Sequence, residues 1–171
     1  MACALTQGNI LDCRDSAGGV KSVYIIEIDN VSGVTSAAGI ATVISKANGK
    51  RFWKYNLVRA TADATEEYQD SVENGTSFHK QTINIILNKM QAATRNEILL
   101  LAQNRLLFVV EDRNSKYWLY GKENGLVRSG GKAGTGKAFG DRNGYELAFG
   151  GEEKDPALEV TSGIIAGLEI P

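Results

Sequence analysis

The segment of this 171-residue chain that comes nearest to a reaction site is Gly131-Lys132-Ala133-Gly134-Thr135-Gly136-Lys137-Ala138. Its spacing is close to that of the phosphate-binding loop G-x-x-x-x-G-K-[ST], whose last residue supplies a hydroxyl to Mg²⁺. Here Ala138 occupies that last position. Residues 139–144 indicate a turn into a strand, whereas a phosphate loop must begin a helix. We therefore expect a surface loop rather than a nucleotide site.

Side chains suited to hydrolysis do not form a recognisable set. His79 is the single histidine, and no catalytic serine or cysteine motif accompanies it. Two carboxylate pairs, Glu66-Glu67 and Glu152-Glu153, are candidates for glycoside hydrolysis. Adjacent residues of a strand point to opposite faces of its sheet, so neither pair converges on one bond. We expect no enzyme activity.

Metal and ligand sites are equally weakly supported. The two cysteines, Cys3 and Cys13, could form a disulfide, but the first seven residues show no basic and apolar signal pattern, so we expect free thiols. A structural zinc site needs four Cys or His ligands, which excludes zinc here. Trp53 and Trp118 could form a ligand platform, although core or interface positions are the favoured interpretation. We expect no metal and no cofactor.

Length and composition place limits on the class of protein. The chain has 19 Lys+Arg, 20 Asp+Glu and 43% hydrophobic residues, which suits one globular domain. A pI of about 5.9 disfavours a dedicated nucleic-acid binder. No apolar run approaches the ~18 residues of a transmembrane helix. The sequence indicates a soluble protein, either intracellular or carried in a particle.

The turns and the apolar periodicity predict a mainly β protein. Asn-Gly favours two-residue hairpins, because type I′ turns need positive φ at both central positions. Apolar residues alternate within residues 23–28, 51–58, 78–87 and 145–149, and shorter strands are expected at 41–47, 117–120 and 126–128. Residues 106–111 are apolar throughout, as in a strand buried on both faces. The four Asn-Gly pairs are Asn48-Gly49, Asn74-Gly75, Asn124-Gly125 and Asn143-Gly144.

One segment interrupts the β pattern. Thr94 and Glu97 match a capping box, and Asn104 is a suitable C-terminal stop. Ile98, Leu101 and Ala102 form a narrow apolar stripe. The sequence therefore predicts one helix over residues 94–104, packed against one or two antiparallel sheets.

Charge is unevenly distributed along the chain. Residues 63–73 contain five acids and no base, and residues 113–142 contain seven bases and two acids. Both segments could simply be solvated, or the acidic segment of one copy could meet the basic segment of the next. The acids are Asp63, Glu66, Glu67, Asp70 and Glu73, and the bases are Arg113, Lys116, Lys122, Arg128, Lys132, Lys137 and Arg142.

Several segments, in order along most of the chain, carry a resemblance to a known family. They are QGNILDCRDSAGG (7–19), ENGTSF (73–78), the predicted helix 94–104, the strand 106–112, GTG (134–136), DRNGYEL (141–147) and EEKDPA (152–157). In these segments the chain resembles the tail tube (major tail) proteins of tailed bacteriophages, particularly those of phages and prophages of Bacteroidetes-like hosts.

The resemblance implies a fold and an assembly. The fold would be a β-sandwich of two packed antiparallel sheets with a flanking helix. Six copies would form a ring whose inner sheets join into a β-barrel, and stacked rings would form the tail tube that conducts DNA into the host. Joined sheets have no exposed edges, and a head-to-tail contact that closes gives a ring. Assembly would take place in the host cytoplasm, and the protein would reside in the virion tail.

The resemblance also suggests partners: further copies of the chain, the tail tip or baseplate, the terminator and the tape measure protein. DNA would pass without specific binding, and no membrane insertion is expected. We expect an extended polar loop or hairpin over residues 59–78, an N-terminal arm over 1–20 and a C-terminal arm over 159–171. Replacing Glu66, Glu67 and Asp70 by Lys should then abolish polymerisation and leave the monomer folded.

The basic residues 122–142 should face the outside or a neighbour, because cations in the lumen would bind DNA phosphates. The alternatives are another tube-like virion component, namely a tail terminator, a head–tail connector ring or the inner tube of a contractile device, and a small β-rich ligand-binding or enzymatic domain. The candidate inter-subunit contacts are Asp63, Glu66, Glu67, Asp70, Glu73, Lys122, Arg128, Lys132, Lys137 and Arg142.

Overall fold

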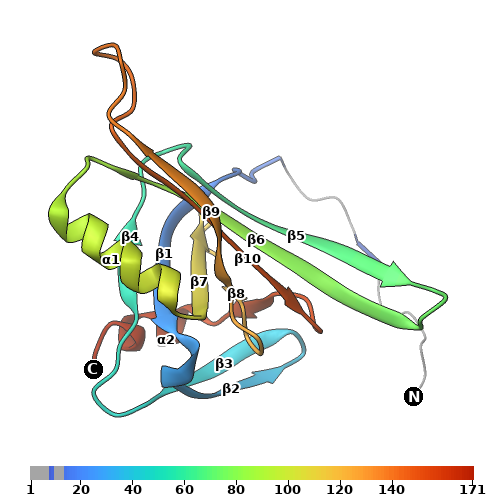
Figure 1. Ribbon diagram of the computed structural model, residues 1–171. Helices are drawn as coiled ribbons and strands as arrows, with labels where there is room; N and C mark the ends of the chain where they lie inside the picture. The colour runs from blue at the N-terminus through green and yellow to red at the C-terminus, as the bar shows by residue number, and fades with distance from the viewer. Residues whose placement is uncertain (1–7, 10–13) are drawn as a thin grey trace.

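The computed structural model describes residues 8–9 and 14–171 and is mainly β (Figure 1). Its elements, in chain order, are β1 (Val20–Glu27), a short 3-10 helix (Ile28–Asn30), β2 (Val31–Ala37), β3 (Ile40–Lys46), β4 (Trp53–Asn56), β5 (Ala62–Ser71), β6 (Thr76–Asn88), α1 (Ala92–Gln103), β7 (Leu106–Asp112), β8 (Tyr117–Tyr120), β9 (Val127–Gly134), β10 (Gly144–Glu153), β11 (Leu158–Val160) and α2 (Ser162–Leu168).

The strands form two sheets. Sheet A has seven strands in the order β2-β3-β11-β8-β7-β1-β4, and sheet B has four in the order β5-β6-β10-β9. Every ladder is antiparallel except the short pairing of β11 with β3. This confirms the predicted mainly β fold with two packed sheets, and it adds one parallel pair.

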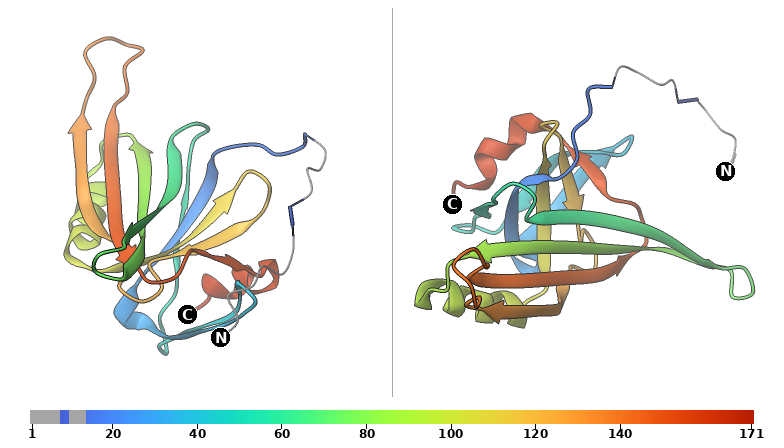
Figure 2. Two further views of the ribbon diagram at one scale, coloured as in Figure 1. Left: turned by 90° about the vertical axis from the view of Figure 1, so that its right-hand side faces the viewer. Right: turned by 90° about the horizontal axis from the view of Figure 1, so that it is seen from above.

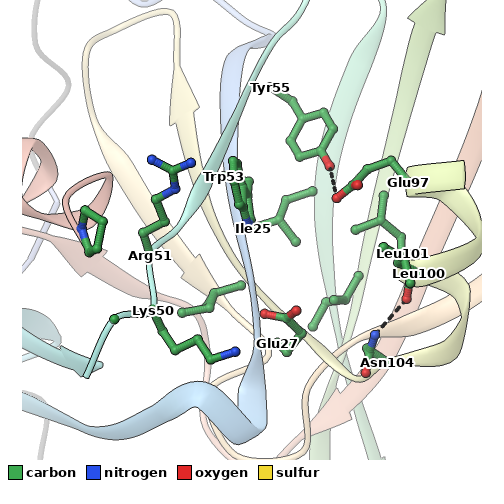
Figure 3. Close-up of a pocket in the computed structure, with 14 residues that line it drawn as sticks. Ile25, Glu27, Lys50, Arg51, Trp53, Tyr55, Glu97, Leu100, Leu101 and Asn104 are labelled. Carbon is green, nitrogen blue, oxygen red and sulfur yellow. Dashed lines mark hydrogen bonds between the residues drawn. The ribbon is translucent and has the colours of Figure 1, made fainter. Parts of the chain in front are cut away.

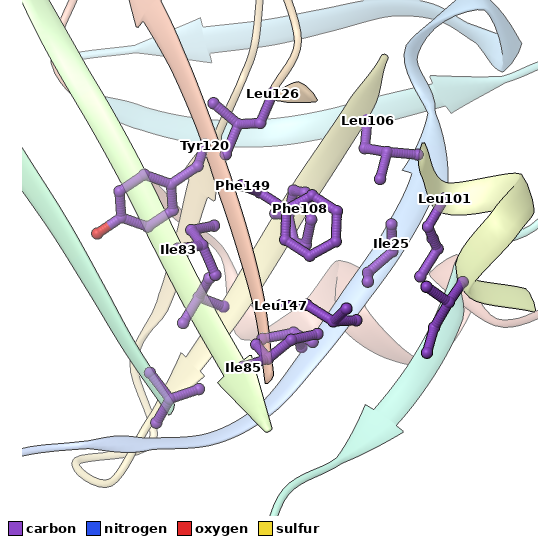
Figure 4. Close-up of a cluster of buried hydrophobic side chains, with 14 residues drawn as sticks. Ile25, Ile83, Ile85, Leu101, Leu106, Phe108, Tyr120, Leu126, Leu147 and Phe149 are labelled. Carbon is purple, nitrogen blue, oxygen red and sulfur yellow. The ribbon is translucent and has the colours of Figure 1, made fainter. Parts of the chain in front are cut away.

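The main core lies between the two sheets (Figure 4). Phe108 of β7 and Phe149 of β10 meet there, with ring centroids 5.0 Å apart. Ile83 and Ile85 of β6 are wholly buried beside them. The first six residues of β7 are buried, which confirms the strand predicted from its continuous apolar run. Sheet B is therefore attached to sheet A by one face, and no element within residues 8–9 and 14–171 covers its other face, which we call the free face.

A second core covers the opposite face of sheet A. Alternate residues of β1 supply it, since Tyr24 and Ile26 point there whereas Val23 and Ile25 point toward sheet B. Helix α2 closes this core with two buried side chains. Strand β11 and helix α2 thus place residues 159–168 on sheet A, and the C-terminal arm expected over residues 159–171 stays a prediction.

Helix α1 differs from its prediction at its start. It begins at Ala92, and no side chain caps its N-terminus, so the predicted capping box does not form. Thr94 lies inside the first turn, and the Glu97 carboxylate instead accepts a hydrogen bond of 3.3 Å from the Tyr55 hydroxyl. The predicted stop is confirmed, because the Asn104 side chain caps the carbonyl of the residue four positions earlier at 2.8 Å.

The Asn-Gly pairs do not form the two-residue hairpin turns that were predicted for them. Asn74-Gly75 lies at the turn between β5 and β6, but Asn48-Gly49 connects β3 to β4, which lie far apart in sheet A. Asn124-Gly125 leads from sheet A to sheet B, and Asn143-Gly144 leads into β10. None of the four asparagines, all of which lie in the described part of the chain, has the positive φ that a type I′ turn requires. The hairpin prediction is therefore wrong for Asn48-Gly49 and Asn124-Gly125, whose flanking strands do not pair with each other. Asn74-Gly75 and Asn143-Gly144 do lie in the connections of hairpins, β5–β6 and β9–β10, but these loops are longer than the predicted two residues.

Two hairpins project from opposite ends of sheet B (Figures 1 and 2). The turn between β5 and β6 lies at one end, and the loop of residues 135–143 between β9 and β10 extends from the other end, next to the start of α1. The N-terminal arm expected over residues 1–20, with Cys3 and Cys13, falls largely outside the described residues. From residue 14 onward the chain leads into β1, and Ala17 and Asn114 exchange two hydrogen bonds.

Candidate assembly interface

The acidic residues of the β5–β6 hairpin do not form one surface. Asp63 and Glu67 alternate with core-facing residues and lie on the free face of sheet B, where Asp63 accepts a hydrogen bond of 3.0 Å from Asn84. Asp70 and Glu73 are exposed near the turn. These four carboxylates remain candidates for contact with another copy.

Glu66 points the other way, into its own chain. One of its carboxylate oxygens accepts hydrogen bonds from the Gln81 side-chain amide at 2.8 Å and from the Ala157 backbone N–H at 2.7 Å. His79 lies 3.4 Å from the other oxygen. Gln81 is buried and accepts a bond of 2.9 Å from the Gly121 N–H. Glu66 therefore holds three separate segments together and is not a free charge.

The basic residues also divide into separate groups. Lys132 of β9 and Arg142 both pair with Glu146 of β10, at 3.1 and 2.8 Å. Hydrogen bonds from Lys132 and then Arg142 outweigh desolvation and hold the pKa of the Glu146 carboxyl below its usual value. Arg128 donates to the nearby Gly130 carbonyl at 3.3 Å. These three cations lie on or beside sheet B, and two of them are compensated internally.

The remaining bases lie elsewhere. Arg113 and Lys116 belong to the turn between β7 and β8 of sheet A, where Lys116 pairs with Glu159 at 2.6 Å. Lys122 is half-buried in the connection from sheet A to sheet B. The structure therefore does not gather the predicted basic segment into one surface.

The phosphate-loop-like motif ends in an ordered tip. The Asp141 carboxylate accepts hydrogen bonds of 2.8 Å from the backbone N–H groups of Lys137 and Ala138. These bonds, first that from Ala138 and then that from Lys137, hold the pKa of Asp141 below its usual value. Phe139 stands fully exposed at the tip. Strand β10 follows the tip, where a nucleotide site would require a helix.

A groove that was not predicted from the sequence runs between β4 and α1 (Figure 3). It has two recesses of about 570 and 560 Å³, both lined by Trp53, Tyr55, Glu97 and Leu101. Burial, followed by the charge of Glu97 and the hydrogen bond to it, raises the pKa of Tyr55. Trp53 is half-exposed, and the Arg51 guanidinium lies 4.1 Å from its ring centre. The groove is therefore apolar with a polar rim.

Large exposed apolar side chains gather around this groove. Val58 lines one recess and Leu100 the other, and both are more than half exposed. Met90 and Leu99 are exposed nearby in the chain. The one sequence signal for this site was the run of leucines on the helix, which is wider than the stripe that α1 needs for its own core. Exposed apolar patches of this kind often mark interaction sites.

Other predicted candidates are separated by the fold. Trp118 lies in β8, where its indole N–H donates to Asp112 at 3.4 Å, whereas Trp53 lies at the groove. Glu153 is buried and accepts two backbone hydrogen bonds, whereas Glu152 is exposed. Among the described residues, no group of three His, Cys, Asp or Glu is placed to hold a metal ion.

Comparisons of the chain with known proteins give no match. No protein family model, no curated protein and no solved structure matches it. Helices long and apolar enough to span a membrane do not occur in residues 8–9 and 14–171.

Proposed function

We propose that this protein is a structural subunit of a bacteriophage tail tube, and that copies of it form rings that stack into a DNA-conducting tube. The resemblance in sequence motivates this proposal, and the form of sheet B carries it. Within residues 8–9 and 14–171, no strand pairs with the outer edge of either β5 or β9. Such unpaired edges are suited to receiving a strand from another copy.

The directions of the four strands support ring closure. Each strand of sheet B runs antiparallel to its neighbour, so β5 and β9 run in opposite directions. When copies are related by rotation about an axis along the strands, β9 of one copy meets β5 of the next as an antiparallel pair. A single repeated contact then gives a closed barrel with four strands from each copy.

The free face of sheet B is suited to a channel wall. The strands place Glu67, Glu146 and Glu152 on this face, together with Lys80. Lys132 also lies on this face. If this face lines the channel, Lys132 faces the lumen, contrary to the expectation that the basic residues 122–142 face away from it. Glu146 compensates the charge of Lys132 at 3.1 Å, and Lys80 lies opposite both Glu67 and Glu152 in the strand register. A wall whose cations lie beside carboxylates would hold DNA phosphates weakly.

Negative-stain electron microscopy of the purified protein across a concentration series tests the proposal. We expect rings or tubes with a central channel. A protein that stays monomeric at every concentration, and also after its own tail-tip proteins are added, would contradict a tube function.

A further inference from the structure

The ends of sheet B are chemically complementary. At one end, the β5–β6 turn carries Val72 with 89% of its surface exposed, and Tyr68 near the end of β5 is 62% exposed. Asp70 and Glu73 flank them, and residues 68–78 contain no Lys or Arg. We name residues 68–78 the acidic tip. It is an apolar and negatively charged projection.

At the other end lies the recess of the groove between β4 and α1 that is lined by Val58, Thr94 and Ile98 (Figure 3 shows the adjoining recess). Arg59 and Arg95 directly follow two of these residues in the chain, and both are exposed. Lys89, which follows the lining residue Asn88, is exposed as well, and the Glu97 carboxylate accepts a hydrogen bond from Tyr55. The recess therefore offers an apolar floor with a basic rim.

Strand β6 separates these two features. It runs from Thr76, next to the acidic tip, to Asn88, which lines the recess. Thirteen residues of strand span about 43 Å, so the tip cannot reach the recess of its own chain. A second copy displaced along β6 by about 40 Å brings its tip to the recess of the first. Repetition of that contact is head-to-tail and open, as in a filament.

We propose that the acidic tip of one copy docks in the β4–α1 recess of a copy in the next ring. Val72 packs on the apolar floor near Val58 and Ile98, and Asp70 and Glu73 face the basic rim. Charge complementarity selects this occupant over the tip that bears Phe139, because Lys137 and Arg142 near that tip would meet a rim of like charge. The inference rests on the proposed function for its arrangement of rings, and it identifies the contact that stacks them.

Charge-reversal variants test the contact. We expect Asp70→Arg with Glu73→Arg, and separately Arg59→Glu with Arg95→Glu, to form rings and to lose tubes in electron micrographs. A chain carrying all four changes should regain tubes, because the attraction is restored with its signs exchanged. Tubes formed by the Arg59 and Arg95 variant at the wild-type protein concentration would overturn the inference and leave the proposed function intact.

A comparison variant separates this contact from pairing with the basic segment. Lys122→Glu with Lys137→Glu changes the net charge by the same amount as the recess variant, outside the recess. We expect its tubes to be normal. Loss of tubes in this variant, with retention in the recess variant, would assign the acidic tip to the basic segment and overturn our inference.

Disulfide cross-linking provides a test that does not need rings. In a background with Cys3→Ser and Cys13→Ser, Val72→Cys protein is mixed with Val58→Cys protein and oxidised. We expect a mixed dimer, and we expect none when Val43→Cys, exposed on β3, replaces Val58→Cys. Equal yields with both partners would overturn the docking. If the Val72→Cys and Val58→Cys proteins cross-link but the wild-type protein never forms rings, the docking stands and the tube function alone is contradicted.

Discussion

Glu66 and Glu67 are neighbouring identical residues for which the structure predicts opposite consequences. Glu66→Ala removes the acceptor for the Gln81 side chain and the Ala157 backbone N–H. A hydrogen bond to a charged group contributes about 1.5–3 kcal/mol, and an abandoned buried donor adds a further cost. The side chain is 23% exposed, so water replaces part of this loss. We expect the free energy of unfolding to fall by about 3 kcal/mol.

Glu67→Ala is the matched control. Glu67 is exposed on the free face of sheet B, where substitutions usually change stability by less than about 0.5 kcal/mol. Urea unfolding followed by tryptophan fluorescence, at concentrations below any assembly, measures both variants. For a chain of this length the loss at Glu66 corresponds to a fall in Tm of about 6–12 °C. Equal midpoints for the two variants would refute the bridging role of Glu66.

Two further predictions concern the fold. Gly144→Ala should lower stability by about 1–3 kcal/mol in the same assay, because its Cβ would collide with the carbonyl of Leu87. Gly134→Ala, directly opposite in the register with open space around its Cβ, should be neutral, and a neutral Gly144→Ala would show that the strands shift freely. Burial acts to raise the pKa of the Glu111 carboxyl, but hydrogen bonds from Lys21 and the neighbouring serine outweigh it and lower the pKa. The ionised Glu111 carboxylate therefore stabilises the fold above the unfolded pKa, and this stabilisation is lost as the pH falls through the lower folded pKa. Glu111→Gln should then cost more stability at pH 7 than at pH 3, measured by urea midpoints. An equal loss at both pH values would contradict this.

The sequence revealed those parts of the fold that depend on burial. Alternation at residues 78–87 and 145–149 identified the strands whose inner faces carry Ile83 and Phe149, because a strand with one buried face must alternate. It did not reveal which strands pair. The tight turn of the β2–β3 hairpin uses Ala38-Gly39, with φ of 51° and 80°, rather than an Asn-Gly pair. Burial between segments far apart in the sequence decides which strands pair, and the residues of a single turn do not reveal those pairings.

The candidate interface was predicted less well, for a related reason. Glu66 and Lys132 were predicted as inter-subunit contacts because they lie close in sequence to other charges of the same sign. In the structure each is held by a side chain or backbone group of its own chain. The recess at Val58 combines residues from β4, β6 and α1, so no single segment carries its pattern. Segment charge identified the acidic tip, because there the charge is continuous along one hairpin.

Charge also bears on which edges of sheet B meet in the proposed ring. Strand β5 carries acids, with Asp63 and Glu67 on the free face, and β9 carries Arg128 and Lys132. Two β5 edges would repel each other, whereas Arg128 of β9 against the acids of β5 is attractive. A two-fold dimer pairs like edges, and a ring pairs unlike ones. The charges on these edges therefore favour the closing, head-to-tail contact that a tube subunit needs.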